Sequence, residues 1–150
     1  MLTADRQRRE RRRSTAVRLG RVSELETGIE ASQEFDVTGR LLTDVGGTLG
    51  ASVLSTPGMI AMMERTATML VRPLLADGSA TVGFEVCVRH VGAAFEGAKC
   101  TAHARLDEIV DGRKLRFAVQ VTADDGRTIG VGTHERRVVS AAGPSPASSR

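Results

Sequence analysis

The spacing of apolar residues changes abruptly in the middle of this chain, and that change restricts the fold more than any other feature. From Thr56 to Val71 apolar side chains recur every three or four positions, the period of a helix with one buried face. After Asp77-Gly78, a turn signal, apolar residues alternate with other residues, the period of a β-strand. A long helix followed only by strands predicts an α+β domain, with the helix packed on an antiparallel sheet.

The ends of the helix are marked by residues with clear local preferences. Thr56 can cap the helix by accepting a backbone N–H, and Pro57 then suits the first helical position. Pro73 forces an end nearby. The expected apolar stripe consists of Met59, Ile60, Met63, Ala67, Leu70 and Val71. A stripe this wide predicts a helix of about four turns that is mostly buried.

Four strands should follow the helix. In the first, one face carries Val82, Phe84, Val86 and Val88, and the other carries Gly83, Glu85, Cys87 and Arg89. The second runs through residues 100–106, and the third, with apolar residues at 115, 117, 119 and 121, follows the hairpin signal Asp111-Gly112. The last spans residues 128–139. Before the helix, residues 30–37 predict an edge strand, and the glycine-rich residues 41–54 predict a loop with a short helical piece.

A curved antiparallel sheet wrapped around one long helix is the hotdog fold. The early strand and the final strand are expected at the sheet edges, where unpaired backbone groups need cover, and this favours a homodimer.

The charge of the chain is unevenly distributed. The overall formal charge is +3, but residues 1–21 carry eight arginines against two acidic residues, which leaves the remainder net acidic. We therefore expect a basic disordered tail at 1–21, one domain at 22–140 and a flexible tail at 141–150. The basic tail lacks aromatic residues for base stacking, so nucleic acid is not the expected partner. No stretch has the length of a membrane span or an apolar leader segment, which favours a cytoplasmic protein without membrane contact.

Three side chains could form a hydrolytic site. Thr56 opens the helix, Glu64 lies two turns along it, and His90 ends the first strand after it. A helix N-terminus offers free N–H groups to a developing oxyanion, and a histidine can move protons near neutral pH. A glutamate among apolar neighbours needs a partner, and His90 would supply one. Each residue alone also has a structural interpretation, as a cap, a helix-former or a core histidine.

The other two histidines have simpler interpretations. His103 alternates onto the solvent face of its strand, and His134 is expected in a cross-strand polar pair with its charged neighbours. The three histidines show no metal-ligand spacing, and no phosphate-binding or dinucleotide-binding glycine motif is present. We therefore expect neither a metal nor a cofactor.

Four segments of the sequence resemble the fluoroacetyl-CoA thioesterase-like hotdog proteins. They are STPGMIAMME at 55–64, TVGFEVCVRH at 81–90, DGRKLRFAV at 111–119 and IGVGTHERRVV at 129–139. The resemblance implies a homodimeric enzyme that hydrolyses acyl-CoA or a related acyl thioester, including one on a carrier protein. It assigns the family's catalytic triad to Thr56, Glu64 and His90. It also assigns a glycine of the acyl pocket to Gly83, and an arginine near the active site to Arg136.

The sequence departs from that family in one segment. The fluoroacetyl-specific member has a phenylalanine-rich lid before the motif threonine, whereas residues 44–52 here read DVGGTLGAS and contain no aromatic residue. The resemblance therefore does not extend to fluoroacetyl specificity. Two other functions remain open: a hotdog hydratase or dehydratase acting on acyl thioesters, and an acyl-thioester binding protein without catalysis.

Overall fold

The fold was analysed in a computed structural model that describes residues 25–142. The tail predicted at 1–21 lies outside the described residues, as does the tail predicted at 141–150 apart from its first two residues. In chain order the elements are β1 (Glu30–Asp36), η1 (Gly39–Leu41), β2 (Leu42–Thr43), β3 (Val53–Leu54), α2 (Thr56–Val71), η2 (Arg72–Leu74), β4 (Ser79–His90), β5 (Lys99–Val110), β6 (Lys114–Ala123) and β7 (Thr128–Ser140). The predicted loop at 41–54 thus holds the end of a short 3-10 helix and a two-stranded ribbon, β2 with β3.

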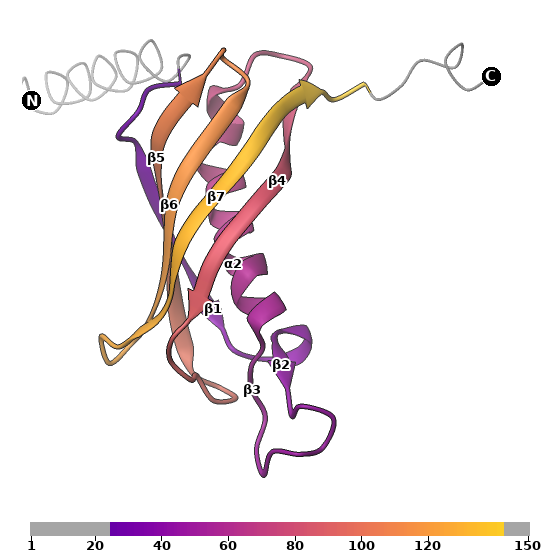
Figure 1. Cartoon of the computed structure of the whole chain (residues 1–150), viewed down its shortest axis with the longest axis vertical. Helices are drawn as coiled ribbons and strands as arrows, with labels where there is room; N and C mark the ends of the chain where they lie inside the picture. The colour runs from indigo at the N-terminus through magenta and orange to yellow at the C-terminus, as the bar shows by residue number, and fades with distance from the viewer. Residues whose placement is uncertain (1–24, 143–150) are drawn as a thin grey trace, which may run out of the picture.

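One antiparallel sheet, in the order β1-β5-β6-β7-β4, curves around helix α2 (Figure 1). The predicted hotdog fold is therefore confirmed. The early strand β1 lies at one edge, as expected. The prediction for the final strand was wrong, because β7 lies between β6 and β4 and the second edge is β4. Sequence patterns give the strands but not this order, since β7 pairs with a strand about 50 residues earlier.

The N-cap of helix α2 lies one residue before Thr56, the cap predicted from the sequence. The N-cap is Ser55, whose Oγ accepts a hydrogen bond from the Gly58 N–H at 2.9 Å. Thr56 is the first helical residue instead, which leaves its hydroxyl free for another contact. Serine and threonine are both good caps, so composition alone could not choose between neighbours.

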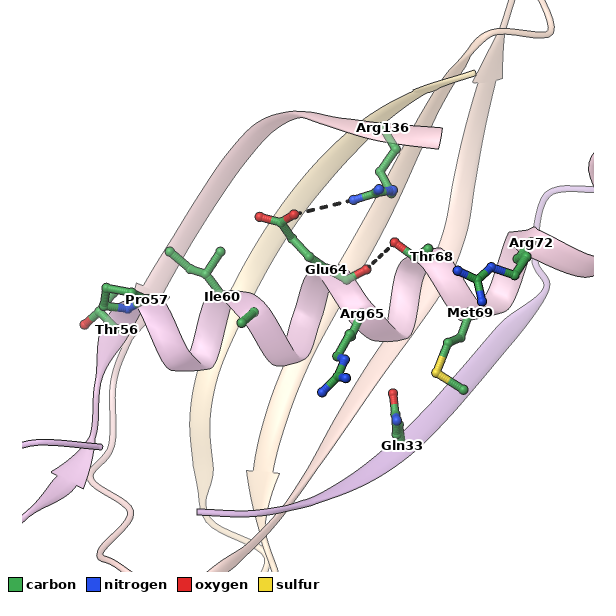
Figure 2. A pocket seen from close by; sticks show the side chains of 11 residues that line it. Gln33, Thr56, Pro57, Ile60, Glu64, Arg65, Thr68, Met69, Arg72 and Arg136 are labelled. Carbon is green, nitrogen blue, oxygen red and sulfur yellow. Dashed lines mark hydrogen bonds and ion pairs between the residues drawn. The ribbon is translucent and has the colours of Figure 1, made fainter. Parts of the chain in front are cut away.

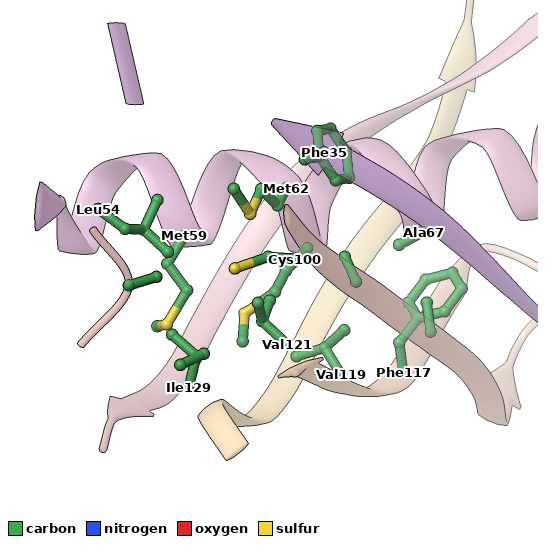
Figure 3. Packing of buried hydrophobic residues seen from close by; sticks show 14 of the residues in the cluster. Phe35, Leu54, Met59, Met62, Ala67, Cys100, Phe117, Val119, Val121 and Ile129 are labelled. Carbon is green, nitrogen blue, oxygen red and sulfur yellow. The ribbon is translucent and has the colours of Figure 1, made fainter. Parts of the chain in front are cut away.

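The core lies between α2 and the concave face of the sheet (Figure 3). Met59, Met62, Met63, Ala67 and Val71 of the helix are all at most 1% exposed. They pack with the alternating apolar residues of β5 and β6, namely Cys100, Ala102, Ala104, Leu106, Leu115, Phe117, Val119 and Val121. Ile60 and Leu70, which were expected in the stripe, are only partly buried. The stripe is therefore rotated toward Met62, and the Ile60 side of the helix is left more open.

Strand β4 does not keep one face along its whole length. Its register with β7 shifts between Gly83 and Glu85, the mark of a β-bulge. Gly83 pairs with Arg136 and Val86 pairs with His134, so Gly83 faces the helix, contrary to the expected alternation. Phe84 lies on the other face, 59% exposed, with the guanidinium of Arg137 3.6 Å from its ring centre. Because of the bulge, Gly83 rather than Phe84 faces the helix.

Among residues 25–142, no helix is long and apolar enough to span a membrane.

Candidate functional site

Two groups of polar side chains lie along the side of α2 that the sheet leaves open. The first group is at the start of the helix, where Thr56 Oγ1 and His90 Nδ1 are 2.9 Å apart, within hydrogen-bonding distance. The two residues meet because α2 starts where β4 ends, as Figure 1 shows. The sequence predicted both residues, and the structure brings them into direct contact.

The second group surrounds Glu64, two turns further along the helix. An oxygen of the Glu64 carboxylate lies 3.5 Å from Arg136 Nη1, and the ion pair is visible in Figure 2. The Arg136 side chain is only 7% exposed, whereas that of Glu64 is 41% exposed. A guanidinium cannot release its proton in a protein, so a buried arginine needs a negative partner. Glu64 supplies that charge and keeps one carboxylate side open to solvent.

Arg136 is held in place by the neighbouring edge strand. Its Nε donates to Thr81 Oγ1 at 2.9 Å, and its Nη2 donates to the Thr81 carbonyl at 3.0 Å. Gly83 leaves room for this arrangement, since a Cβ built there would lie 3.2 Å from a Glu64 carboxylate oxygen and 3.6 Å from Arg136 Nη1. The sequence-predicted residues Gly83, Glu64 and Arg136 therefore form one cluster.

The two groups are separate within one chain. Glu64 follows Thr56 by eight residues, which corresponds to about 12 Å along the helix axis. No hydrogen bond or ion pair joins Glu64 to Thr56 or to His90 in the described part of the chain. The expected pairing of Glu64 with His90 is thus not present within one protomer.

Both groups nevertheless contribute to one cavity of about 840 Å³ over the open side of α2. We call it the helix hollow, and its lining includes Gln33, Thr56, Glu64, Arg65, Arg72 and Arg136. Thr56 also lines a second, smaller cavity together with His90. Thr56 therefore lines both cavities, the one that contains His90 and the helix hollow that contains Glu64.

A family model of the fluoroacetyl-CoA-specific thioesterases matches residues 37–142. The chain belongs to this family. A fluoroacetyl-CoA thioesterase from Streptantibioticus cattleyicolor is 38% identical to this chain over 88 residues. These residues make up 58% of this chain and 61% of that protein, so the match spans about three-fifths of that relative. A structure of a variant of the fluoroacetyl-CoA-specific thioesterase in complex with fluoroacetate and CoA matches with a TM-score of 0.71 at 27% identity, over 79% of this chain and 98% of that one. A Thermus thermophilus thioesterase superfamily member has a TM-score of 0.70 at 26% identity, over 78% and 85% of the two chains.

In this member of the fluoroacetyl-CoA-specific thioesterase family, His134 joins the cluster of Glu64 and Arg136. This role of His134 was not predicted from the sequence. Its side chain is buried and its ring stacks with Phe117, the ring centres being 6.2 Å apart. Arg136 Nη1 donates to His134 Nε2 at 3.3 Å, so His134 Nδ1 carries the proton and donates to the Glu85 carbonyl at 2.8 Å. Burial, followed by the charge of Arg136, lowers the pKa of His134. The ring is therefore neutral and holds Arg136 against Glu64.

A sequence signal for His134 did exist. Arg136 was already placed near the site, and His134 stands two positions before it on the same strand, hence on the same face. The expected cross-strand contact is present, but it is made with the backbone carbonyl of Glu85 rather than with a charged side chain.

Proposed function

We propose that this protein hydrolyses an acyl thioester, of the acyl-CoA class, to a free acid and a thiol. The observation that carries the proposal is that the open side of α2 presents both a Thr56–His90 pair, 2.9 Å apart, and a half-exposed Glu64 carboxylate. Family membership supports the same reaction, as does the family's bound CoA in a solved structure.

The first turn of α2 would orient the thioester carbonyl. Pro57 has no N–H, the Gly58 N–H is bonded to Ser55 Oγ, and the Met59 N–H is bonded to the Ser55 carbonyl. The oxyanion donors available in this turn are then the Thr56 hydroxyl and the Thr56 backbone N–H. Both are close to the positive end of the helix dipole, which favours negative charge on the carbonyl oxygen.

Glu64 would provide the attacking electron pair. It either adds to the thioester carbon, forming an anhydride that water then cleaves, or removes a proton from a water molecule that adds instead. In both routes the C–S bond breaks and His90 delivers a proton to the departing thiolate, and the water that is consumed returns a proton to His90. Single turnover in ¹⁸O-labelled water tests the anhydride route, because the label enters the Glu64 side chain only when water attacks the Glu64 carbonyl of an anhydride.

The complete site would be formed by two chains. Glu64 is too far along the helix to reach its own His90, and β4 is a suitable edge for pairing. On β1 the exposed residues are Glu30, Ser32, Glu34 and Asp36, and such polar or charged residues oppose edge pairing. On β4, Val82, Phe84 and Val86 are all at least 36% exposed. We infer a homodimer paired through β4, in which Glu64 of one chain acts with Thr56 and His90 of the other.

The test of the activity is thiol release from a panel of saturated and enoyl acyl-CoAs. Wild type should release thiol, and Glu64→Gln should lose at least about a thousandfold in kcat, since it keeps the shape and removes the charge. Glu34→Gln, the same chemical change on the exposed face of β1, is the matched control and should be fully active. Consumption of enoyl-CoA without thiol release would show a hydratase, and tight CoA binding without turnover would show a binding protein.

The test of the shared site is complementation between inactive variants. Glu64→Gln and His90→Asn chains, unfolded and refolded together, form mixed dimers with one intact site if the site spans two chains. Activity should return to about a quarter of wild type, since half of the dimers are mixed and each has one of two sites. No recovery in verified mixed dimers would place both residues in the same chain.

A further inference from the structure

In a dimer paired through β4, the position of the Glu64 carboxylate determines which residues of the two edge strands face each other. A Cβ built on Gly83 would lie 3.2 Å from a Glu64 carboxylate oxygen, so the carboxylate lies over Gly83 on the helix side of β4. Directly opposed residues of antiparallel strands have Cβ atoms about 5 Å apart, so the residue that faces Gly83 is the best placed to meet Glu64. For a shared site, that residue must be His90 of the other chain. His90 lies on the same side of the sheet, because it pairs with Gly130, where a Cβ would meet Met59 of the helix.

This one contact defines the register of the two strands. In a two-fold dimer, if one residue faces a second, the second faces the first across the axis. Gly83 therefore faces His90 at both ends of the paired segment, and the extra residue of the bulge, Phe84, is passed over in counting inward. The inner pairs are then Glu85 with Arg89, Val86 with Val88, and Cys87 with Cys87 of the other chain.

The charges on the outer face of β4 support the same register. Glu85 and Arg89 are exposed on the face away from the helix, two residues before and two residues after Cys87. Within residues 25–142 neither of the two makes a salt bridge. In this register Glu85 of each chain faces Arg89 of the other, so opposite charges meet twice across the axis. Sliding the strands by two residues in either direction separates both pairs.

The backbone groups of β4 also fit this arrangement. The Val91 N–H donates to the Ile129 carbonyl of β7 at 2.8 Å. Backbone groups of alternate residues point to the same side of a strand, so those of Cys87 are directed to β7, and those of Val86 and Val88 to the free edge. The two Cys87 residues would then form a non-hydrogen-bonded pair, with Cα atoms about 4.5 Å apart, which is within the range for a disulfide.

We propose that two copies of this chain pair antiparallel through β4 with Cys87 on the two-fold axis and Gly83 of each chain facing His90 of the other. The inference rests on the shared site of the proposed function and extends it, because it states which residues meet across the interface. The chain also carries its own reporter of this register. Cys87 is exposed, whereas Cys100, the second of the two cysteines in the sequence, is 1% exposed in the core.

Oxidative cross-linking tests the register. Diamide, an azo oxidant, accepts two electrons and two protons from a pair of thiols and becomes a hydrazine while one S–S bond forms. Wild type treated with diamide should run as a covalent dimer on a non-reducing gel, and Cys87→Ser should not, although both are dimers by analytical ultracentrifugation beforehand.

Two further variants distinguish this register from its neighbours. A slide of two residues would place Val86 or Val88 on the axis, with the Cys87 residues about 8 Å apart, too far for a disulfide. In the Cys87→Ser background, Val86→Cys and Val88→Cys should therefore cross-link at least about tenfold more slowly than wild type. Faster cross-linking of either variant would overturn the register, and no cross-link at any of the three positions would overturn pairing through β4.

Charge reversal gives a second measurement of the same interface. Arg89→Glu brings like charges together and should weaken the dimer at least about tenfold in Kd, whereas the exchange Glu85→Arg/Arg89→Glu should restore it. Failure of the exchange to restore the dimer would overturn the pairing of these charges. Wild type that cross-links through Cys87 but hydrolyses no acyl-CoA would reject the hydrolase and keep the interface. Thioesterase activity with rapid cross-linking only at position 86 or 88 would keep the hydrolase and reject the register.

Discussion

Thr56 Oγ1 lies 2.9 Å from His90 Nδ1, which joins the first residue of α2 to the last residue of β4. The contact orients the hydroxyl and the imidazole relative to each other before any substrate is present. Preorganised donors of this kind act on charge that develops in the transition state, so their removal should affect kcat more than substrate binding.

We predict that Thr56→Val lowers kcat by about a hundredfold or more, because valine keeps the branched shape and removes the hydroxyl. Thr56→Ser keeps a hydroxyl and should lose less than about tenfold. Steady-state kinetics on the best acyl-CoA of the panel measure both. If Thr56→Val were as active as Thr56→Ser, the hydroxyl would have no part in the chemistry.

Ser55, the residue before Thr56, caps helix α2. Substitutions at the two positions should therefore differ in their effect on the free energy of unfolding. Ser55→Ala removes the acceptor of the Gly58 N–H and should lower the free energy of unfolding by about 1 kcal/mol. Thr56→Val leaves that hydrogen bond in place and should cost less. Urea unfolding of both variants measures the difference. A larger loss of free energy of unfolding in Thr56→Val than in Ser55→Ala would show that Thr56 is the cap.

The sequence predicted much of this arrangement because the relevant signals are local. Helix ends, strand phases and turns depend on neighbouring residues, so Pro57, Pro73 and Asp111-Gly112 located the elements correctly. The order of strands depends on distant pairing, which explains why β4 rather than β7 is the second edge. The contact of Thr56 with His90 is also non-local: local signals placed both residues in one candidate site, but they predicted that His90 would pair with Glu64.

The bulge in β4 explains the remaining errors at the site. One extra residue near Phe84 reverses the alternation, so strict period-two reasoning put Gly83 on the wrong face. Gly83 itself was a signal, because a glycine inside a strand often marks a bulge or a close approach by another group. His134 was underestimated for a related reason, since its importance comes from Glu85, Arg136 and Phe117 meeting around it.

Gly83 should matter for activity more than for stability. In Gly83→Ala the new Cβ would stand 3.2 Å from a Glu64 carboxylate oxygen, the movable end of a side chain that can shift by a few tenths of an ångström. We predict a fall of about tenfold in kcat/KM, because small displacements of a reacting group are costly, with the free energy of unfolding changed by less than about 1 kcal/mol. Gly50→Ala, where a Cβ would meet nothing within 4 Å, is the control and should be unchanged. Full activity in Gly83→Ala would mean that Glu64 tolerates displacement.

The buried His134 gives the fold a pH dependence whose sign follows from its lowered pKa. Burial and then the charge of Arg136 disfavour the imidazolium, while the Glu85 carbonyl and the Glu64 carboxylate partly offset them. As pH falls below 6.5, the ordinary value for histidine, the unfolded chain binds a proton at this residue that the folded chain still refuses. The contribution of His134 to stability is therefore complete above that pH, decreases as the pH falls, and levels off below the folded-state pKa.

We predict that His134→Asn removes this part of the pH dependence. Asparagine can still donate to the Glu85 carbonyl, but it does not titrate. Urea unfolding at intervals from pH 8 to pH 5 should show wild type losing stability relative to the variant as the pH falls below 6.5. His103→Asn, on the sheet face away from the helix, should keep the decline that His134→Asn abolishes. Parallel curves for wild type and His134→Asn would show that the imidazole is protonated equally in the folded and unfolded chains, and the neutral ring assigned between Glu85 and Arg136 would be wrong.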